Sequence, residues 1–338
     1  MERELALEFV RVTEAAAIAS GRWMGRGDKN AADDAAVEAM RAVFDSIAIE
    51  GTIVIGEGEM DEAPMLYIGE NVGMGMGHPR VDIAVDPLEG TNLVAKGLNG
   101  SIAVLAVAEE GKLLHAPDMY MDKICVGPKA KGAINLDASA AENLKNVAKA
   151  LGKAVGDLTV VILDRERHQK LIQDCRDAGA RIKLITDGDV SPAVACAFDE
   201  SGVDIMMGIG GAPEGVLAAA ALRCLGGDMQ ARLYPENDTE IARAKEMGLK
   251  DPLQLLTLDD LVCGDDVIFA ATGITDATPL RGVLYEGNSV KTHSVVMRAK
   301  TGTIRYVEAV HRSDKEIFSK LNITFLHILS VVLSKLDG

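Results

Sequence analysis

Two carboxylates, Asp86 and Glu89, lie three residues apart within residues 81–92, which read Val-Asp-Ile-Ala-Val-Asp-Pro-Leu-Glu-Gly-Thr-Asn. The apolar, β-branched opening of this segment predicts a buried strand, which Pro87 is expected to end. Asp86 then lies at the carboxyl end of the strand, Glu89 follows three residues later, and a short helix is expected over residues 93–98. The free amides of a helix start attract anions that carboxylates repel, so the segment makes chemical sense mainly if metal cations lie between them. Ordinary turn chemistry around Asp-Pro is the alternative.

Further carboxylates stand where other predicted elements begin or end. Asp33 falls in the expected first turn of a helix that Asn30 could cap, and Glu57 follows a short β-branched strand over residues 52–55. Each has a structural alternative, because Asp33 could complement the helix dipole and the acids over residues 57–62 could form a solvated loop. In a dry site, by contrast, such acids would repel one another unless cations neutralised them.

The composition of the chain argues against several classes of protein. Its 338 residues are enough for a large core and two lobes, and 48% of them are hydrophobic. A net charge of −16 without any basic run argues against nucleic-acid binding. The five cysteines form no Cys-x-x-Cys pair, the amino terminus lacks a signal-peptide pattern, and the apolar run over residues 323–333 is about half as long as a membrane span. We therefore expect a cytoplasmic protein with reduced thiols and no membrane segment.

Strands and helices alternate in the second half of the sequence. Strands are expected over residues 159–163, 182–185 and 203–209, and helices over residues 165–178, from residue 191 and over residues 213–225. This alternation implies an α/β fold whose sheet is largely parallel or mixed and covered on both faces, with ligands at the carboxyl ends of the strands. We place a boundary between an amino-terminal lobe (1–155) and a substrate lobe (156–338), although the last strands could return to the first lobe.

A competing interpretation attaches to residues 208–215. A strand, a glycine-rich turn and a helix are the setting of a dinucleotide site, and Gly208-x-Gly210 fits the first half of that fingerprint. Pro213 stands where the fingerprint needs a small residue, and Glu214 would meet a diphosphate as a like charge. A nicotinamide-dependent oxidoreductase is therefore the weaker enzyme hypothesis. An acidic metal-binding protein without enzymatic activity is the remaining alternative.

The order Asp86-Pro-Leu-Glu-Gly-Thr91 resembles the Asp-Pro-X-Asp-Gly-Thr signature of metal-dependent, lithium-sensitive phosphatases of inositol phosphates and fructose bisphosphate. Glu89 in place of the second Asp narrows the resemblance to class II fructose-1,6-bisphosphatase. The resemblance implies a layered α-β-α-β-α sugar-phosphatase fold, with two mixed sheets sandwiched by helices. It also implies an all-oxygen ligand set, which selects Mg²⁺ or Mn²⁺ over zinc or copper. The implied ligands are Asp33, Glu57, Asp86, Glu89, Glu214 and the backbone carbonyl of Leu88.

The same resemblance implies a reaction, namely hydrolysis of the 1-phosphate of fructose 1,6-bisphosphate in gluconeogenesis by in-line attack of a metal-activated water. Thr91 would help to position the water, Asp61 or Glu59 would orient it or accept its proton, and Lys29 would balance charge. Two arginines suit the phosphate that does not react. The implied substrate contacts are Glu89, Gly90, Thr91, Tyr120, Arg165, Glu166, Arg167, Asp187, Gly188, Asp189 and Gly211, of which Glu166 is expected to point away.

Substrate and assembly stay open at this point. Sedoheptulose 1,7-bisphosphate or an inositol phosphate are alternative substrates within the phosphatases. Apolar residues recur on one face of a helix expected over residues 4–24, a pattern typical of core packing or subunit contact. We therefore expect a homo-oligomer, either a dimer or a tetramer, that acts on a small sugar bisphosphate.

Overall fold

The computed structural model describes residues 1, 4–58 and 65–312. Glu59, Asp61 and the apolar tail, about which the sequence made predictions, lie outside this part of the chain. Its helices are α1 (Leu5–Gly21), α2 (Lys29–Phe44), α3 (Thr91–Lys96), α4 (Ala140–Leu151), α5 (Gln169–Asp177), α6 (Val190–Ala195), α7 (Ala212–Leu225), α8 (Asp238–Glu246) and α9 (Leu258–Leu261). Its strands are β1 (Glu50–Ile55), β2 (Asn71–Val72), β3 (Arg80–Glu89), β4 (Ile102–Glu109), β5 (Tyr120–Val126), β6 (Thr159–Leu163), β7 (Arg181–Ile185), β8 (Ile205–Gly211), β9 (Asp228–Tyr234), β10 (Leu256–Thr257), β11 (Ile268–Gly273), β12 (Leu284–Glu286), β13 (Ser289–Arg298) and β14 (Thr303–Arg312).

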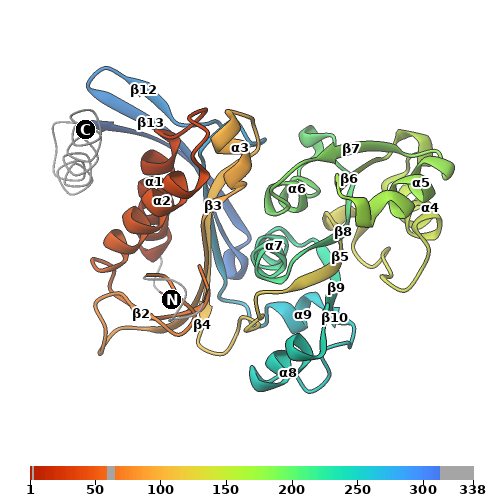
Figure 1. Cartoon of the computed structure of the whole chain (residues 1–338), viewed down its shortest axis with the longest axis horizontal. Helices are drawn as coiled ribbons and strands as arrows, with labels where there is room; N and C mark the ends of the chain where they lie inside the picture. Colours follow the sequence, from red (N-terminus) through yellow and green to blue (C-terminus); the bar gives the residue numbers. More distant parts are fainter. Residues whose placement is uncertain (2–3, 59–64, 313–338) are drawn as a thin grey trace, which may run out of the picture.

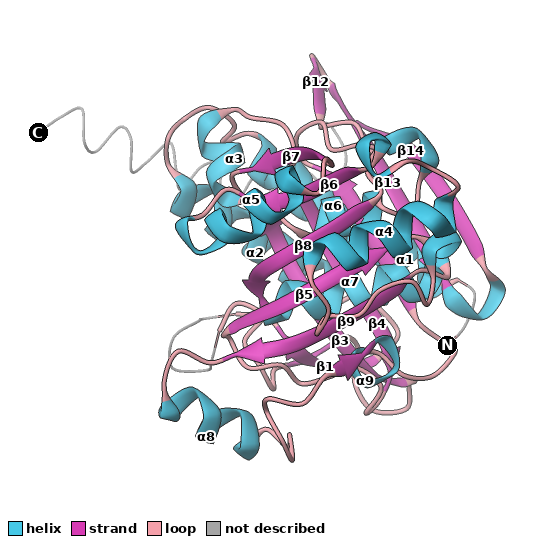
Figure 2. Ribbon diagram, turned by 90° about the vertical axis from the view of Figure 1, so that its right-hand side faces the viewer, coloured by secondary structure: helices cyan, strands magenta, loops and turns pink. Residues whose placement is uncertain are grey.

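Two mixed sheets organise these elements. The eight-stranded sheet has the order β12-β13-β11-β4-β3-β1-β2, with β14 on the other edge of β13. The six-stranded sheet has the order β10-β9-β5-β8-β6-β7, in which β6 runs parallel to β7 and β8. Figure 2 shows β5, β8 and β9 side by side in this second sheet. The strands from β11 to β14 thus join β1 to β4 in one sheet, whereas the division into lobes at residue 155 stays a prediction.

The helices lie in three layers around the two sheets (Figure 1). Helices α1 and α2 cover the outer face of the eight-stranded sheet, α6 and α7 lie between the sheets, and α4 and α5 cover the far face of the six-stranded sheet. Strand β4 explains how one strand serves two layers, because alternate side chains point to opposite faces. Its residues Val104 and Ala106 join the core around α7, while Ala103 and Leu105 join the core under α1 and α2. The predicted α-β-α-β-α architecture is therefore confirmed.

The strand that carries the first carboxylate pair does not end at Pro87. Strand β3 continues to Glu89, and three steps along β3, from Asp86 to Glu89, match two steps along β4. One residue is therefore extra on β3, which makes a bulge. Proline lacks the N–H that a ladder requires, so it is tolerated at such a bulge. The prediction that Pro87 ends the strand was wrong, although Asp86 does mark the point where regular pairing is interrupted.

Two predicted helix starts also shift. Helix α2 begins at Lys29, and Asp28 rather than Asn30 caps it, since the Asp28 side chain accepts a hydrogen bond of 3.0 Å from the amide of Ala31. Asp33 is consequently the fifth residue of the helix and lies beyond the first turn. The helix predicted over residues 165–178 is instead a short 3-10 turn (Glu166–His168) followed by α5.

Several elements of the second half were missed. Strand β5 passes through a segment in which only Tyr120 had been singled out, and β9 and α8 lie in a region without any prediction. By contrast, β6 has the bounds expected from its pattern. The five cysteines are free thiols. In the part of the chain that the structure describes, no helix is both long and apolar enough to cross a membrane.

Candidate active site

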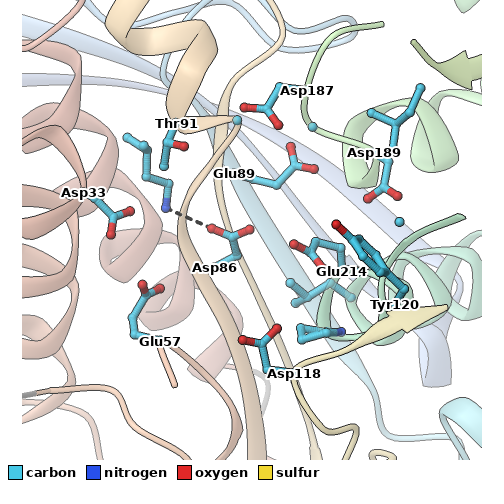
Figure 3. Close-up of a pocket in the computed structure, with 18 of the residues that line it drawn as sticks. Asp33, Glu57, Asp86, Glu89, Thr91, Asp118, Tyr120, Asp187, Asp189 and Glu214 are labelled. Atoms are coloured by element: carbon cyan, nitrogen blue, oxygen red, sulfur yellow. Dashed lines mark hydrogen bonds between the residues drawn. The ribbon is translucent and has the colours of Figure 1, made fainter. Parts of the chain in front are cut away.

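A cavity of about 440 Å³ opens between the two sheets at the carboxyl ends of β6, β7 and β8. Its polar side chains come from several elements that surround it (Figure 3). We call the first group the acidic wall; it consists of Asp33, Glu57, Asp86, Glu89 and Glu214. We call the second group the mixed wall; it consists of Tyr120, Arg165, Arg167, Asp187 and Asp189. Residues far apart in the sequence thus meet in one place, which the strand-end argument had predicted.

The acidic wall draws each carboxylate from a different structural context. Asp33 projects from α2, Glu57 follows β1, and Glu214 lies in the first turn of α7. Asp86 and Glu89 flank the bulge of β3, where the amide of Leu88 donates a hydrogen bond of 3.1 Å to Asp86 Oδ1. The bulge therefore holds the side chain of Asp86 and turns the backbone of Leu88 toward the cavity.

Glu89 is fixed by hydrogen bonds from the start of α6 and from the residue before β4. Its Oε1 accepts a hydrogen bond of 2.8 Å from the amide of Val190, and its carbonyl accepts one of 2.7 Å from the Ser101 hydroxyl. Gly188 has a φ of +73°, and a Cβ there would lie 2.9 Å from Glu89 Oε2. A side chain at position 188 is therefore excluded both by backbone conformation and by this close approach.

Burial and mutual repulsion raise the pKa values of the acidic wall. Burial, followed by the nearby Asp34, raises the pKa of Asp33 to about 6, and Lys29 opposes this shift. Burial, with Asp33 and Glu214 next, raises the pKa of Glu57 to about 8. The pKa values of Asp86, Glu89 and Glu214 are also raised, in each case first by burial and then by neighbouring carboxylates. Carboxylates in this state repel one another when they ionise, so the wall favours positive charge.

The donor set fits a hard divalent cation. Glu89 Oε2 and Glu214 Oε2 are buried and have no hydrogen-bond partner among the described residues. Buried carboxylate oxygens are rarely left unsatisfied, and a cation would satisfy both. All donors are oxygens, which suits Mg²⁺ or Mn²⁺. Within the described residues, however, no three acidic, histidine or cysteine side chains already stand close enough together to enclose an ion.

The charges of the mixed wall have protein partners. Asp187 accepts hydrogen bonds of 3.2 and 3.1 Å from the amide and side chain of Asn92, and Arg165 Nη2 lies 3.9 Å from its Oδ1. The guanidinium of Arg167 lies 4.5 Å from the ring centre of Tyr120 and donates to the carbonyl of Ile209 at 2.8 and 3.2 Å. These contacts leave both arginines at the cavity, where guanidinium groups can bind an anion.

Two buried residues behind the mixed wall were missed from the sequence. Lys123 on β5 lies 2.7 Å from Asp189 Oδ2 and donates a hydrogen bond of 2.8 Å to the Gly211 carbonyl. His168 accepts a hydrogen bond of 2.8 Å from the amide of Ile209 at Nε2, while Nδ1 lies 2.7 Å from the Leu163 carbonyl. Since Nε2 accepts, Nδ1 must carry the hydrogen, and the ring is neutral. His168 thus joins the arginine segment to the end of β8.

Other predicted site residues have different outcomes. Leu88, Gly90, Thr91, Gly188 and Gly211 line the cavity. Lys29 and Glu166 are exposed and are not among the lining residues, as had been expected for the side chain of Glu166. Glu59 and Asp61 lie outside the described residues. Asp118 also lines the cavity and was missed, although its position two residues before Tyr120 offered a signal.

Comparison with known proteins agrees with this geometry. A family model described as bacterial fructose-1,6-bisphosphatase, glpX-encoded, matches residues 3–311. The fructose-1,6-bisphosphatase 1 class 2 of Escherichia coli (strain K12) is 50% identical over 329 residues, which cover 94% of this chain and 97% of that protein. The D-fructose 1,6-bisphosphatase class 2/sedoheptulose 1,7-bisphosphatase of Synechococcus sp. (strain JA-2-3B'a(2-13)) is 48% identical over 340 residues, which cover 93% and 97% respectively. The resemblance expected from residues 86–91 is confirmed, and the chain belongs to the bacterial, glpX-encoded fructose-1,6-bisphosphatase family.

Proposed function

We propose that the protein hydrolyses the 1-phosphate of fructose 1,6-bisphosphate to give fructose 6-phosphate and inorganic phosphate, a step of gluconeogenesis. One observation carries the proposal: a single cavity has five carboxylates in one group and two arginines, with two further carboxylates, in the other. The two phosphates of a bisphosphate need different protein environments. The reacting end needs cations held by carboxylates, and the other end needs a permanent positive charge.

The acidic wall would hold Mg²⁺ or Mn²⁺ through Asp33, Glu57, Asp86, Glu89, Glu214 and the carbonyl of Leu88. When bound, such ions neutralise phosphoryl charge and lower the pKa of a coordinated water. The chain supplies the rest. Thr91 opens α3 beside Glu89 and lines the cavity, where its hydroxyl can donate to a phosphoryl oxygen. Asp61 or Glu59 would accept the proton of the water, and Lys29 would moderate the charge near Asp33.

The mixed wall would orient the sugar. Arg165 and Arg167 would bind the 6-phosphate, since both line the cavity and their guanidinium groups carry a permanent charge. The carboxylates of Asp187 and Asp189, with the backbone at Gly188 and Gly211, would accept hydrogen bonds from sugar hydroxyls. Tyr120 is 37% exposed, and its ring is stacked against the guanidinium of Arg167. The ring can pack against the sugar. This arrangement would present the 1-phosphate to the acidic wall.

Sedoheptulose 1,7-bisphosphate is the second candidate substrate, because the relatives from two Synechococcus strains are named as fructose 1,6-bisphosphatase and sedoheptulose 1,7-bisphosphatase. Its sugar is one carbon longer, so the same two anionic ends must be accommodated at a larger separation. An inositol phosphate is a weaker candidate. We further propose that the enzyme works in the cytoplasm as a homo-oligomer, which light scattering coupled to size-exclusion chromatography would test.

The function is tested by phosphate release across a panel of sugar phosphates. We expect release from fructose 1,6-bisphosphate with Mg²⁺ or Mn²⁺, its loss in EDTA and its recovery when the metal is restored. Sedoheptulose 1,7-bisphosphate, fructose 6-phosphate and inositol 1-phosphate complete the panel. Metal-dependent release from none of them would overturn the proposal. Stabilisation in a thermal-shift assay by metal alone would then favour a metal-binding protein, and stabilisation by NAD an oxidoreductase.

A further inference from the structure

Lys123 is a charged side chain that the proposed reaction does not yet use. It lies on β5 with 1% of its surface exposed, so it cannot touch a substrate in the cavity directly. Burying an ammonium group is strongly unfavourable unless it is paired and hydrogen-bonded. A residue in this position must therefore have specific partners, and those partners indicate what it does.

The Lys123 ammonium contacts two residues at the cavity. It lies 2.7 Å from Asp189 Oδ2 and donates at 2.8 Å to the carbonyl of Gly211. Asp189 and Gly211 come from different elements, the start of α6 and the end of β8, and both line the cavity. One buried group therefore joins two separate parts of the mixed wall.

The ion pair packs closely against the backbone of β8 at Gly210. A Cβ at Gly210 would lie 2.0 Å from Asp189 Oδ2 and 3.1 Å from Lys123 Cε. A glycine at this position therefore allows the ion pair to lie against the backbone of β8. Burial tends to lower the pKa of Lys123, but Asp189 and then Glu214 outweigh it and raise that pKa. The lysine stays charged and its position is fixed.

We infer that Lys123 is a positioning residue for sugar recognition, which clamps the Asp189 carboxylate and the Gly211 peptide in the orientation that the substrate requires. Because the ammonium engages Asp189 Oδ2, Oδ1 is the oxygen left to accept a hydrogen bond from a sugar hydroxyl. Without the lysine, Asp189 would be a buried carboxylate beside Gly211 and Glu214 with no fixed direction. The inference rests on the proposed function, since it assigns Asp189 to the sugar.

The test compares Lys123→Met, Asp189→Asn and the double variant. Lys123→Met should raise the KM for fructose 1,6-bisphosphate by about tenfold or more while kcat falls by less than about threefold, because the lysine acts through sugar binding. Binding of fructose 6-phosphate in EDTA, measured by calorimetry, should weaken by a similar factor. In the Asp189→Asn background, Lys123→Met should change KM by less than about twofold, because the residue it positions is already altered.

Lys153→Met is the matched control. Lys153 pairs with the buried Asp204 at 2.5 Å, and neither residue lines the cavity. Its loss should leave KM and kcat within about twofold of the parent. If Lys123→Met fails to fold, the double variant, which buries no unpaired charge, is compared with Asp189→Asn alone, and any further rise in KM overturns the inference. So does a kcat loss at unchanged KM. A parent enzyme that neither hydrolyses the bisphosphate nor binds fructose 6-phosphate would instead reject the proposed function.

Discussion

The acidic and mixed walls handle charge in opposite ways. On the mixed wall, Asp189 has the ammonium of Lys123 and Asp187 has Asn92 and Arg165. The acidic wall has raised pKa values throughout, and Glu89 Oε2 and Glu214 Oε2 lack partners among the described residues. One wall is neutralised from within the protein, whereas the other needs cations from outside. This difference explains how one cavity can bind the reacting phosphate through cations and the other phosphate through arginines.

The carboxylates of the two walls should also affect the stability of the metal-free protein in opposite directions. Ionised carboxylates on the acidic wall destabilise the metal-free fold, because burial and like charge both oppose ionisation. A carboxylate on the mixed wall stabilises the fold through its partner, and removing it leaves a buried cation unpaired. The same Asp→Asn substitution should therefore have opposite effects on the two walls.

The largest expected effect tests that contrast directly. Asp86→Asn should lower kcat by about a thousandfold or more, because it removes a charged ligand at the reacting end. The same variant should raise the Tm of the metal-free protein, since one buried like charge is gone. Asp189→Asn should lower that Tm, because Lys123 loses its ion-pair partner. Phosphate release and thermal unfolding in EDTA measure these changes. A fall in Tm of similar size for both variants would show that the walls do not differ.

A smaller effect concerns the anion site of the mixed wall. Arg165→Ala should raise the KM for fructose 1,6-bisphosphate by about tenfold to a hundredfold, while the KM for a slowly hydrolysed monophosphate such as p-nitrophenyl phosphate changes by less than about threefold. The reason is that only the bisphosphate has a second phosphate for the guanidinium to bind. Glu166→Ala is the control, because this neighbour is exposed and does not line the cavity. An equal rise for both substrates would reject the anion site.

The residues of the acidic wall could be named from the sequence because the resemblance carried by residues 86–91 implied them. Asp86 and Glu89 share one short motif, and Asp33 and Glu57 each stand at or near the end of an element with a clear apolar pattern. What could not be predicted is the bulge of β3. A residue of β3 counts as extra only when the pairing of β3 with β4 is known. The sequence of β3 alone does not contain that information.

The clamp behind the mixed wall could not be predicted for a different reason. The burial of Lys123 depends on its pairing with Asp189, which lies far away in the sequence at the start of α6. The adjacent charges of Asp122 and Lys123 also interrupt the apolar pattern of β5, so the strand itself was missed. Strand β9, by contrast, alternates buried and less buried residues along Asp228–Tyr234 and offered a pattern that could have been used.

The smallest expected effect is the pH dependence of metal-free stability. The pKa of Glu57 is raised to about 8 and that of Asp33 to about 6, above the ordinary values of 4.5 and 3.8 for these side chains. The folded state therefore binds more protons than the unfolded state in this range, so stability is greatest at low pH and falls as pH rises from about 4 toward 8. In EDTA, the Tm should fall by about 5 °C between pH 5 and pH 8.

Two controls show whether this slope belongs to the acidic wall. In the Glu57→Gln variant the side chain cannot ionise. The Tm should therefore change less between pH 6 and pH 8 than it does in the parent. Saturating Mg²⁺ or Mn²⁺ should raise the Tm more at pH 8 than at pH 5, because the ions bind the deprotonated carboxylates. Asp189→Asn, on the mixed wall, should keep the parent slope at a lower Tm. If neither Glu57→Gln nor the metal changes the dependence of Tm on pH, the acidic wall does not carry uncompensated charge. The two walls would then not differ in the way proposed.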